Sequence, residues 1–546
     1  MGNAQEILED EVTQKSKEVM PSEALTKEVL GAKVKQMSEE KDTLRVALEA
    51  KLKEVALERD GLQQDLDKLK AVSADEIRKY AKILADVWTR PAAVPRERLF
   101  IDDPVFARLE VEPELCPVLA HPLVQRLNHI KQLAFAYLVY PSATHTRLSH
   151  CLGVSKLAEI ALNGMLNRGV LYTLEGVEPI TLTRADRRRL VLKAKVAGML
   201  HDVGHGPFGH ALDRLVGCYY QPKKEITHAD KEFSRRYIKT FLADRLPEGV
   251  EAEEIALMVS STTEEVDLKD WDCLIAQLVN STLDLDRMDY LTRDAHMTGL
   301  AMQKSIVTEL ISGMRPFKKE EKILLTYDRS SLPHFDPFLY TREMMFLNCY
   351  DHPRKAAAER IFTRLVVGLM GRHNIPLEQV MMLADEQILA LLTLDSASDA
   401  ESSNLLSTLV QNQEYELVLE KDVKAVPEWS RARDKGRGKE AYVEIPGRLE
   451  REIAERSELG TDKAWQVLVV VPAQEVIIPV EIGTPILFEE LGGYKTLKLS
   501  HVFPRLVVPL KKLIEIRNRI RVFADLRLES AVRSRIGDVA EEILKP

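Results

Sequence analysis

The sequence predicts a mostly α-helical protein with an N-terminal coiled coil and a smaller α+β part at its C-terminal end. Three observations lead to this fold class. Residues 22–72 carry apolar side chains at alternating spacings of 3 and 4, residues 76–375 hold a series of amphipathic segments, and valine and isoleucine become frequent from about residue 464. The expected organisation is a coiled-coil helix over residues 1–75, a helical domain over 76–375 and an α+β region over 376–546.

The N-terminal segment has the pattern of a helix that pairs with other copies of the chain. Charged residues surround an apolar seam, and a shift in register divides that seam into two stretches. The seam residues are Leu30, Val34, Met37, Leu44, Leu48, Leu52, Val55, Leu62, Leu66 and Leu69. We expect a homo-oligomer tied by this seam and by the helical domain. Lys41 interrupts the seam, so the number of strands stays open, and a single solvated helix is the alternative.

The middle segment is predicted to be helical because apolar residues recur at spacings of 3 and 4 in KLAEIALNGMLNRG, DRRRLVLKAKVAGMLHD and DKEFSRRYIKTFLADRL. Past residue 464, WQVLVVV and EVIIPVEI predict strands, with a Gly-Gly turn following at 492–493. The final stretch, LKKLIEIRNRIRVFADLRLESAVRSRIGDVAEEILK, predicts one or two amphipathic helices.

Composition excludes several classes of protein. Hydrophobic residues make up 45% of the 546 residues, which argues against a disordered chain, and no stretch approaches the ~20 apolar residues of a membrane span. The net charge of −9 argues against a general attraction to nucleic acid, although local basic runs leave such binding open. The N-terminus has no secretory signal, and the five cysteines form no CxxC pair. We therefore expect a protein of the reducing cytoplasm.

Histidines and aspartates in the helical domain predict a metal site. His150 follows THTRLS, His201-Asp202 ends the apolar segment VLKAKVAGML, and Asp286 lies in STLDLDRMDY. Imidazole nitrogens and carboxylate oxygens together suit a divalent transition metal or Mg²⁺. One His-Asp pair alone is better explained by helix capping or core packing.

The loop after His201-Asp202 strengthens the prediction. In VGHGPFGH, three glycines and a proline within six residues must end the helix, and the loop carries two further histidines, His205 and His210. Asp213 and His228 follow closely and could orient or protonate groups in the site. Such a cluster of charged groups predicts a metal-centred active site.

The order H…HD…D resembles the signature of the HD phosphohydrolase superfamily. The segments IDDPVFARLEV, HPLVQRLNHIKQLAFAYLVYPSATHTRLSHCLGV, HDVGHGPFGHALD and LDLDRMDYLTRDAHMTG are similar to its deoxynucleoside triphosphate (dNTP) triphosphohydrolases. These include the animal sterile-alpha-motif and HD-domain dNTPases and bacterial dGTPase-like proteins. The resemblance covers about residues 98–365, leaves out the N-terminal seam and includes no sterile-alpha-motif domain.

The resemblance implies an HD-domain helical core that hydrolyses a dNTP to deoxynucleoside and tripolyphosphate. The implied ligands of the divalent metal ion (Mn, Mg or Fe, one or two per site) are His150, His201, Asp202 and Asp286. The implied catalytic groups are His205, His210, Asp213 and His228. In particular, His210, paired with Asp213, resembles the group that protonates the leaving 5′ oxygen.

The resemblance also implies two sets of substrate contacts. The triphosphate would be held by Arg147, Arg287, Tyr290 and Arg342, and the deoxyribose by Gln132, Leu133, Asp294 and Tyr350. Guanidinium groups suit a triphosphate because they form paired, charge-assisted hydrogen bonds with phosphate oxygens. The alternatives are that Arg147 and Arg342 are ordinary salt-bridge partners and that Tyr350 is a core residue.

Two departures concern regulation. Where the animal enzymes have an aspartate and an arginine that bind an activating guanine nucleotide, this chain has Ala120 and Asn128. We therefore expect assembly that does not require GTP. Two other functions stay open: another phosphohydrolase activity, such as that of a nucleotidase, a nuclease or a signalling-nucleotide hydrolase, and a nucleotide-sensing scaffold. The intact ligand set disfavours the scaffold.

Overall fold

Helices make up most of the structure, as predicted. The computed structural model describes residues 74–90, 97–212, 215, 229–260, 268, 270–397, 399–434, 440–472, 483–490, 493–504 and 517–545. All of them belong to the unit Val72–Pro546. The predicted coiled coil, Asp213, His228 and the segment EVIIPVEI lie outside the described residues, so those predictions stay untested.

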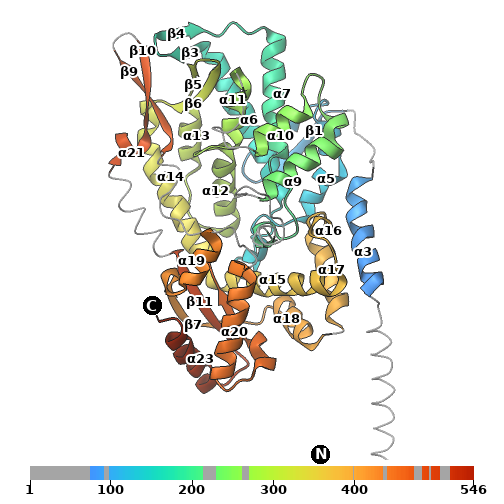
Figure 1. Cartoon of the computed structure of the whole chain (residues 1–546). Helices are drawn as coiled ribbons and strands as arrows, with labels where there is room; N and C mark the ends of the chain where they lie inside the picture. The colour runs from blue at the N-terminus through green and yellow to red at the C-terminus, as the bar shows by residue number, and fades with distance from the viewer. Residues whose placement is uncertain are drawn as a thin grey trace, which may run out of the picture. The chain divides into compact units, whose positions relative to one another are not determined.

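The longest described helices are α6 (Arg147–Arg168), α15 (Pro353–His373) and α7 (Arg184–Leu200), and both α7 and α12 (Leu285–Thr298) pack against α6 (Figure 1). The other helices are α3 (Ala74–Asp86), α4 (Cys116–Leu119), α5 (Pro122–Arg126), α9 (Ala229–Tyr237), α10 (Ala252–Ser260), α11 (Asp270–Val279), α13 (Lys304–Ser312), α14 (Leu332–Met345), α16 (Leu377–Met381), α17 (Asp385–Ser396), α18 (Ala400–Val410), α19 (Pro427–Asp434), α20 (Ile445–Arg456), α21 (Leu499–Val502) and α23 (Ser530–Ile543). Within the described ranges, every helix is too short or too polar to span a lipid bilayer.

The strands form three small sheets. They are β1 (Leu99–Asp103), β2 (Ala107–Val111), β3 (Val170–Thr173), β4 (Gly176–Pro179), β5 (Met314–Lys319), β6 (Lys322–Tyr327), β7 (Tyr415–Asp422), β8 (Val467–Val470), β9 (Pro485–Glu490), β10 (Gly493–Lys498) and β11 (Arg519–Asp525). β1 pairs with β2, a six-stranded sheet has the order β10-β9-β6-β5-β3-β4, and a third sheet has the order β7-β11-β8. The antiparallel strands β9 and β10 thus join a sheet whose other strands come from the helical part of the chain (Figure 1).

The C-terminal stretch corrects one prediction. Its second half is the helix α23, as expected, but residues 519–525 form the strand β11 and not a helix. β11 is the central strand of its sheet, and Ile520, Val522 and Phe523 are buried in it. Tertiary pairing with a strand on each side decides the conformation here, because β-branched and aromatic residues pack well on a pleated surface.

Two glycines allow the central helices to approach closely. A Cβ on Gly198 of α7 would lie 2.9 Å from the backbone of Ser155 in α6, and a Cβ on Gly153 of α6 would lie 1.9 Å from the Asp289 carboxylate of α12. A larger residue at either position would push the helices apart. These contacts bring the His150 end of α6 beside the C-terminal end of α7 and the first turns of α12.

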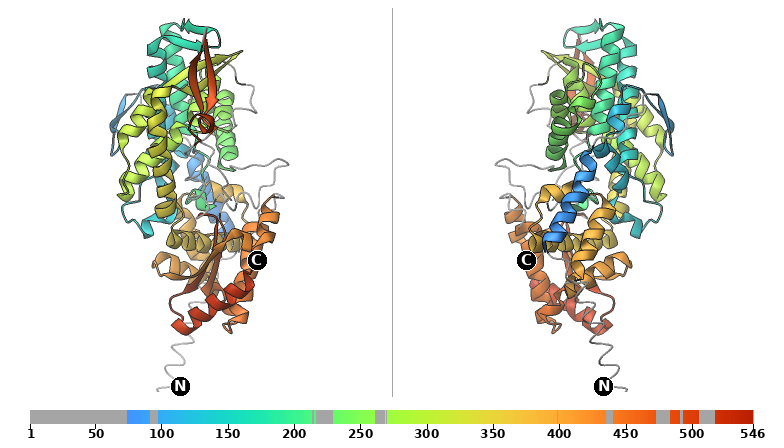
Figure 2. Two further views of the ribbon diagram at one scale, coloured as in Figure 1. Left: turned by 90° about the vertical axis from the view of Figure 1, so that its left-hand side faces the viewer. Right: turned by 90° about the vertical axis from the view of Figure 1, so that its right-hand side faces the viewer.

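Helix α3 lies against the helical domain through one apolar face. Ile77, Ala81 and Ala85 are buried on that face, and α3 contacts α15, α16 and α17 (Figure 2). Arg78 Nε also donates a hydrogen bond to the carbonyl oxygen of His373, at 3.0 Å. The segment that follows the predicted coiled coil is therefore anchored to the helical domain.

Candidate metal centre and active site

Three side chains converge on one point where α6, α7 and α12 meet. His150 Nε2 lies 3.2 Å from His201 Nε2 and 3.0 Å from Asp286 Oδ1, and the two histidines are almost fully buried. His201 Nε2 lies 3.6 Å from the same Asp286 oxygen. The ligand atoms of these residues all lie within 4.8 Å of one another, which is a spacing that one metal ion can bridge.

The other ring nitrogen of each histidine is held by a hydrogen bond. His150 Nδ1 lies 2.8 Å from Asp289 Oδ2, and His201 Nδ1 lies 2.8 Å from the Gly198 carbonyl oxygen. Because each neighbour is an acceptor, each Nδ1 carries the proton, and in the neutral imidazole the Nε2 lone pair is then free. Two such lone pairs 3.2 Å apart repel each other unless a proton or a metal ion lies between them. The donor set therefore fits a divalent metal.

Asp202 closes the cluster from the side of the loop. Its carboxylate lies 3.4 Å from His201 Nε2, 3.3 Å from His205 Nε2 and 3.8 Å from His150 Nε2. Arg147 Nη1 donates a hydrogen bond to Asp202 Oδ2 at 2.6 Å. The fourth predicted ligand thus lies beside both candidate histidine ligands and also contacts an arginine.

The electrostatics favour positive charge at the centre. Burial opposes ionisation of Asp202, but His201, His205 and Arg147 outweigh it and hold the pKa of that carboxyl well below its usual range. For His150, burial acts to lower the pKa, yet the hydrogen bonds to Asp286 and Asp289 raise it to about 10. The carboxylates that favour a proton on His150 would equally favour a divalent cation, which competes with that proton.

Arg126 and Asp385 hold the loop that follows His201-Asp202. The fully buried Arg126 guanidinium donates hydrogen bonds to the carbonyl oxygens of Val203 and His205 on one side and of Met381 and Leu383 on the other. Asp385 accepts hydrogen bonds from the backbone nitrogens of Lys131 and Phe208, at 2.9 and 2.6 Å. Neither residue was predicted as part of the site, because their partners are backbone atoms distant in sequence.

Two of the four predicted catalytic residues are described. The rings of His205 and His210 lie with their centroids 4.9 Å apart and nearly perpendicular. His205 is buried and contacts Asp202, whereas His210 is exposed. His210 therefore stands on the solvent side of the cluster, at the end of the loop. Asp213 and His228 lie outside the described residues.

The predicted sugar contacts gather around Asp294 in α12. Tyr350 Oη donates a hydrogen bond to Asp294 Oδ2 at 2.8 Å, and His145 Nε2 lies 2.7 Å from Asp294 Oδ1. Gln132 is joined to the same group because its backbone nitrogen donates to the His145 carbonyl oxygen, and Leu133 is buried next to it in sequence. His145 was not predicted, although it lies in the same THTRLS segment that precedes His150.

The residues predicted to contact the triphosphate differ in their hydrogen-bond partners. Arg147 Nε and Nη2 are buried and have no hydrogen-bond partner among the described residues, so this guanidinium retains donors for an anion. Arg287 Nη1 donates to the Ser281 carbonyl oxygen and to Asp284, and Arg342 pairs with Glu343. The Tyr290 ring lies 6.4 Å from the His150 ring and 6.1 Å from the Tyr350 ring, between the metal ligands and the sugar contacts.

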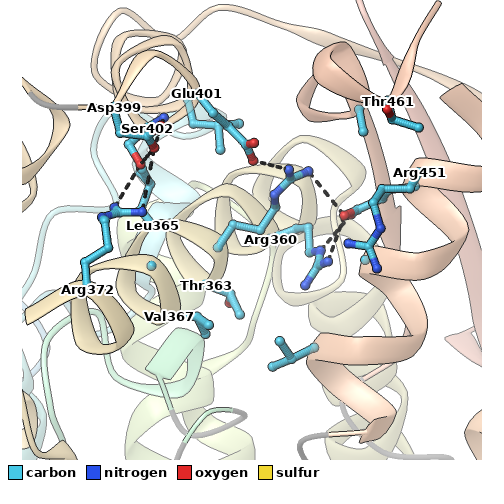
Figure 3. A pocket seen from close by; sticks show the side chains of 17 residues that line it. Arg360, Thr363, Leu365, Val367, Arg372, Asp399, Glu401, Ser402, Arg451 and Thr461 are labelled. Carbon is cyan, nitrogen blue, oxygen red and sulfur yellow. Dashed lines mark hydrogen bonds and ion pairs between the residues drawn. The ribbon is translucent and has the colours of Figure 1, made fainter. Parts of the chain in front are cut away.

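A cavity of about 420 Å³ lies elsewhere, between α15, α18 and α20 (Figure 3). Two of its arginines are already paired: Arg360 and Arg364 both bind Glu450, and Arg364 also binds Glu401. This network joins the helical domain to the C-terminal region. The cavity contains none of the predicted site residues.

Residues 147–294 match the model of the HD domain family. Among curated proteins, the chain is 30% identical over 236 residues to an uncharacterized protein of Mycoplasma genitalium, which covers 43% of this chain and 51% of that protein. It is 26% identical over 280 residues to the deoxynucleoside triphosphate triphosphohydrolase SAMHD1 of Homo sapiens, covering 46% and 41% of the two chains. The matched region spans about half the length of these relatives.

Two solved structures have a similar fold. A hypothetical protein from Aquifex aeolicus gives a TM-score of 0.56 at 21% identity, covering 80% of this chain and 100% of that chain. A phosphohydrolase from Bacteroides thetaiotaomicron gives a TM-score of 0.57 at 19% identity, covering 78% and 100%. Residues 147–294 thus form an HD domain that contains the candidate His150, His201 and Asp286 metal site, and the relatives of this region include dNTP triphosphohydrolases.

Proposed function

We propose that this HD-domain protein hydrolyses deoxynucleoside triphosphates to deoxynucleoside and tripolyphosphate. The observation that carries the proposal is the convergence of the His150, His201 and Asp286 ligand atoms within 4.8 Å, beside a buried arginine with unused donors. A centre of this kind fits a metal-assisted attack on a phosphoryl group. The resemblance to dNTP triphosphohydrolases in the matched region supports the choice of substrate.

Each side chain has a distinct task in this proposal. A divalent metal held by His150, His201, Asp202 and Asp286 would polarise a phosphoryl oxygen and acidify a water molecule. Asp289 holds the His150 ring in the orientation that a ligand needs. The Arg147 guanidinium binds the α-phosphate side of the triphosphate through the two donors that Asp202 does not use.

The leaving group of this reaction is the 5′ oxygen of the deoxynucleoside, which must gain a proton as its bond to phosphorus breaks. His210 stands at the exposed edge of the centre, with its ring against that of His205. We assign it the role of general acid, in which it donates its proton to the 5′ oxygen. His205, Asp213 and His228 complete the group of catalytic residues in this proposal.

The proposal includes a preference for deoxyribose over ribose. Tyr350 is held by Asp294, and the proposed place of the sugar lies against this pair, to which Gln132 is joined through His145. The Tyr350 ring would clash with a ribose 2′-hydroxyl, whereas Asp294 and Gln132 can bind the 3′-hydroxyl. Arg287, Tyr290 and Arg342 would hold the outer phosphates.

The proposal is tested by product analysis. The purified protein is incubated with each dNTP and each ribonucleotide in the presence of Mn²⁺, Mg²⁺ or Fe²⁺, and the products are separated by anion exchange. We expect deoxynucleoside and tripolyphosphate in equal amounts, with lower rates for the ribonucleotides. Release of diphosphate, or of mononucleotides from DNA, would instead identify the other phosphohydrolase activities. Binding of dNTP without any product would identify the nucleotide-sensing scaffold.

A further inference from the structure

Arg517 connects the C-terminal part of the chain to the proposed substrate contacts. It lies just before β11 and outside the matched HD domain. Its guanidinium places Nη1 3.0 Å from Glu343 Oε2 and Nε 3.0 Å from Asp351 Oδ2, and the side chain is only 8% exposed. One buried arginine therefore bridges two carboxylates.

Each of the two carboxylates directly follows a proposed substrate residue in the sequence. Glu343 follows Arg342, and Asp351 follows Tyr350. Between them lies η7 (Phe346–Tyr350), a single turn of π-helix, and such turns are frequent at functional sites. The guanidinium carbon of Arg517 lies 3.4 Å from the centre of the Phe346 ring, and that of Arg342 lies 4.7 Å from it.

Glu343 couples Arg342 and Arg517 electrostatically. It is 1% exposed, and it pairs with Arg342 through Oε1 and with Arg517 through Oε2. A carboxylate buried to this degree needs its positive partners. In the native chain the charge of Glu343 is shared between Arg342 and Arg517. Without Arg517, Glu343 attracts Arg342 alone, and the Arg342 guanidinium is drawn toward Glu343 and away from a bound phosphate.

We propose that Arg517 is a positioning residue that sets the place of Arg342 and Tyr350 in the active site. This inference rests on the proposed function, and it deepens it by making triphosphate affinity depend on the C-terminal region. A lysine cannot replace Arg517, because one ammonium group lacks the planar fork that reaches both carboxylates at once. Arg521 supports the same segment, since its Nη1 donates to the Asp351 carbonyl oxygen at 2.8 Å.

The test compares R517A, R517K and the double variant E343Q/R517A with the wild-type full chain. The control R533A removes another ion pair of the C-terminal part, between Arg533 and Glu416. We expect R517A to raise KM for a dNTP by roughly 10–100-fold, the size of a charged hydrogen bond, with a smaller change in kcat. R517K should fall short of wild type, R533A should keep the wild-type KM, and E343Q/R517A should recover most of the lost affinity because the competing carboxylate is gone.

A merely structural role predicts a different pattern. In that case the loss in R517A would follow a lowered melting temperature, and E343Q would add to the damage instead of relieving it. Either that pattern or an unchanged KM in R517A overturns the inference.

Calorimetric binding of inorganic tripolyphosphate separates this inference from the proposed function. Wild-type protein that hydrolyses no dNTP would refute the proposed function, while a weaker binding of tripolyphosphate to R517A would still uphold the role of Arg517. An equal dissociation constant for wild type and R517A, or no binding to wild type, would overturn it.

Discussion

At the scale of single residues, the candidate centre depends on how its histidines are oriented. Asp289 and the Gly198 carbonyl oxygen each bind the Nδ1 of one histidine, and both Nε2 atoms consequently face the same point. Arg293 in turn binds Asp289 at 2.9 Å and Asp103 at 2.7 Å, so the orienting carboxylate is itself fixed. The ligands and their supports form one continuous network of buried polar groups.

Removal of a ligand should abolish metal binding without unfolding the chain. We expect His201→Ala and Asp202→Ala to lose the bound metal and to keep the helical circular dichroism of wild type. Asp289→Asn should keep the ligands but weaken metal affinity by roughly 10–100-fold, because the His150 ring loses its anionic partner. Metal content is read by atomic absorption after dialysis. Full metal occupancy in His201→Ala would show that the centre lies elsewhere, and full occupancy in Asp202→Ala would remove Asp202 from the ligand set.

His210 should affect turnover and not metal content. We expect His210→Ala to lower kcat by roughly 10²–10⁴-fold, which is the usual size of lost general acid catalysis. Metal content, read on the same samples, should stay close to that of wild type. If the loss of activity follows a loss of metal, His210 is a ligand and not the acid.

Asp385 should make stability depend on pH. Burial raises its pKa from 3.8 to about 6, against the opposing hydrogen bonds from Lys131 and Phe208. Because the folded-state pKa is the higher one, the native chain holds a proton that the unfolded chain releases. The stabilising contribution is complete below about pH 4, declines as the pH rises to about 6 and is absent above that.

Urea unfolding of wild type and Asp385→Asn at several pH values measures the pH-dependent contribution of Asp385 to stability. The difference in unfolding free energy between the two chains should change by roughly 2–3 kcal/mol between pH 4 and 6.5, to the disadvantage of wild type, and stay level at higher pH. A difference that is constant across this range would contradict the assignment.

At the scale of elements, the centre exists because three helices approach closely. The helices touch at Gly153 and Gly198. The side chains of Asp289 and Arg293 in α12 fill the space that a Cβ on Gly153 would need. The Thr183–Asp186 capping box starts α7, and His201 is the residue that ends it. The ends of the helices therefore place the ligands.

A matched pair of glycine variants tests the helix contact. Gly153→Ala should lower stability by roughly 1–3 kcal/mol and weaken metal binding, because its Cβ would overlap the Asp289 carboxylate. Gly164→Ala lies in the same helix with nothing within 4 Å of the added Cβ, and it should raise stability by roughly 0.5–1 kcal/mol. Thermal unfolding and metal content are measured for both. Equal effects would show that α6 and α12 do not meet at Gly153.

The local motifs explain how much of the site could be predicted. The candidate ligands could be chosen from the sequence because the His-Asp pair, the glycine-rich loop and the aspartate segment are each recognisable within a few residues. Asp289, His145 and Arg517 were not, because their importance comes from partners far away in the chain. The prediction of a helix near residue 520 was wrong for the same reason, because the two strands that pair with β11 come from elsewhere in the sequence.

At the scale of the whole molecule, the C-terminal region is part of the architecture around the site. β9 and β10 extend the sheet of the helical domain, and Glu450 binds Arg360 and Arg364 of α15. We propose domain boundaries near residues 75 and 375, where the composition of the chain changes. The expected cytoplasmic location stays a prediction.

Assembly is predicted from the seam of residues 30–69 together with the helical domain. Burial of that seam would contribute about 25 cal/mol per Å² of apolar surface. Light scattering should give an oligomer for the full chain without nucleotide and a smaller species for a chain that lacks residues 1–72. GTP should not be required, because Ala120 and Asn128 lack the groups that would bind a guanine nucleotide. A full-length monomer that assembles only with GTP would contradict both statements.

The oxygen atom of the attacking water identifies which bond of the substrate is hydrolysed. The wild-type protein is incubated with a dNTP and Mn²⁺ in water enriched in ¹⁸O, and the products are weighed by mass spectrometry. Attack at the α-phosphorus with release of the 5′ oxygen predicts one ¹⁸O in tripolyphosphate and none in the deoxynucleoside. Labelled deoxynucleoside monophosphate with diphosphate, or products that form equally with His201→Ala, would contradict the account.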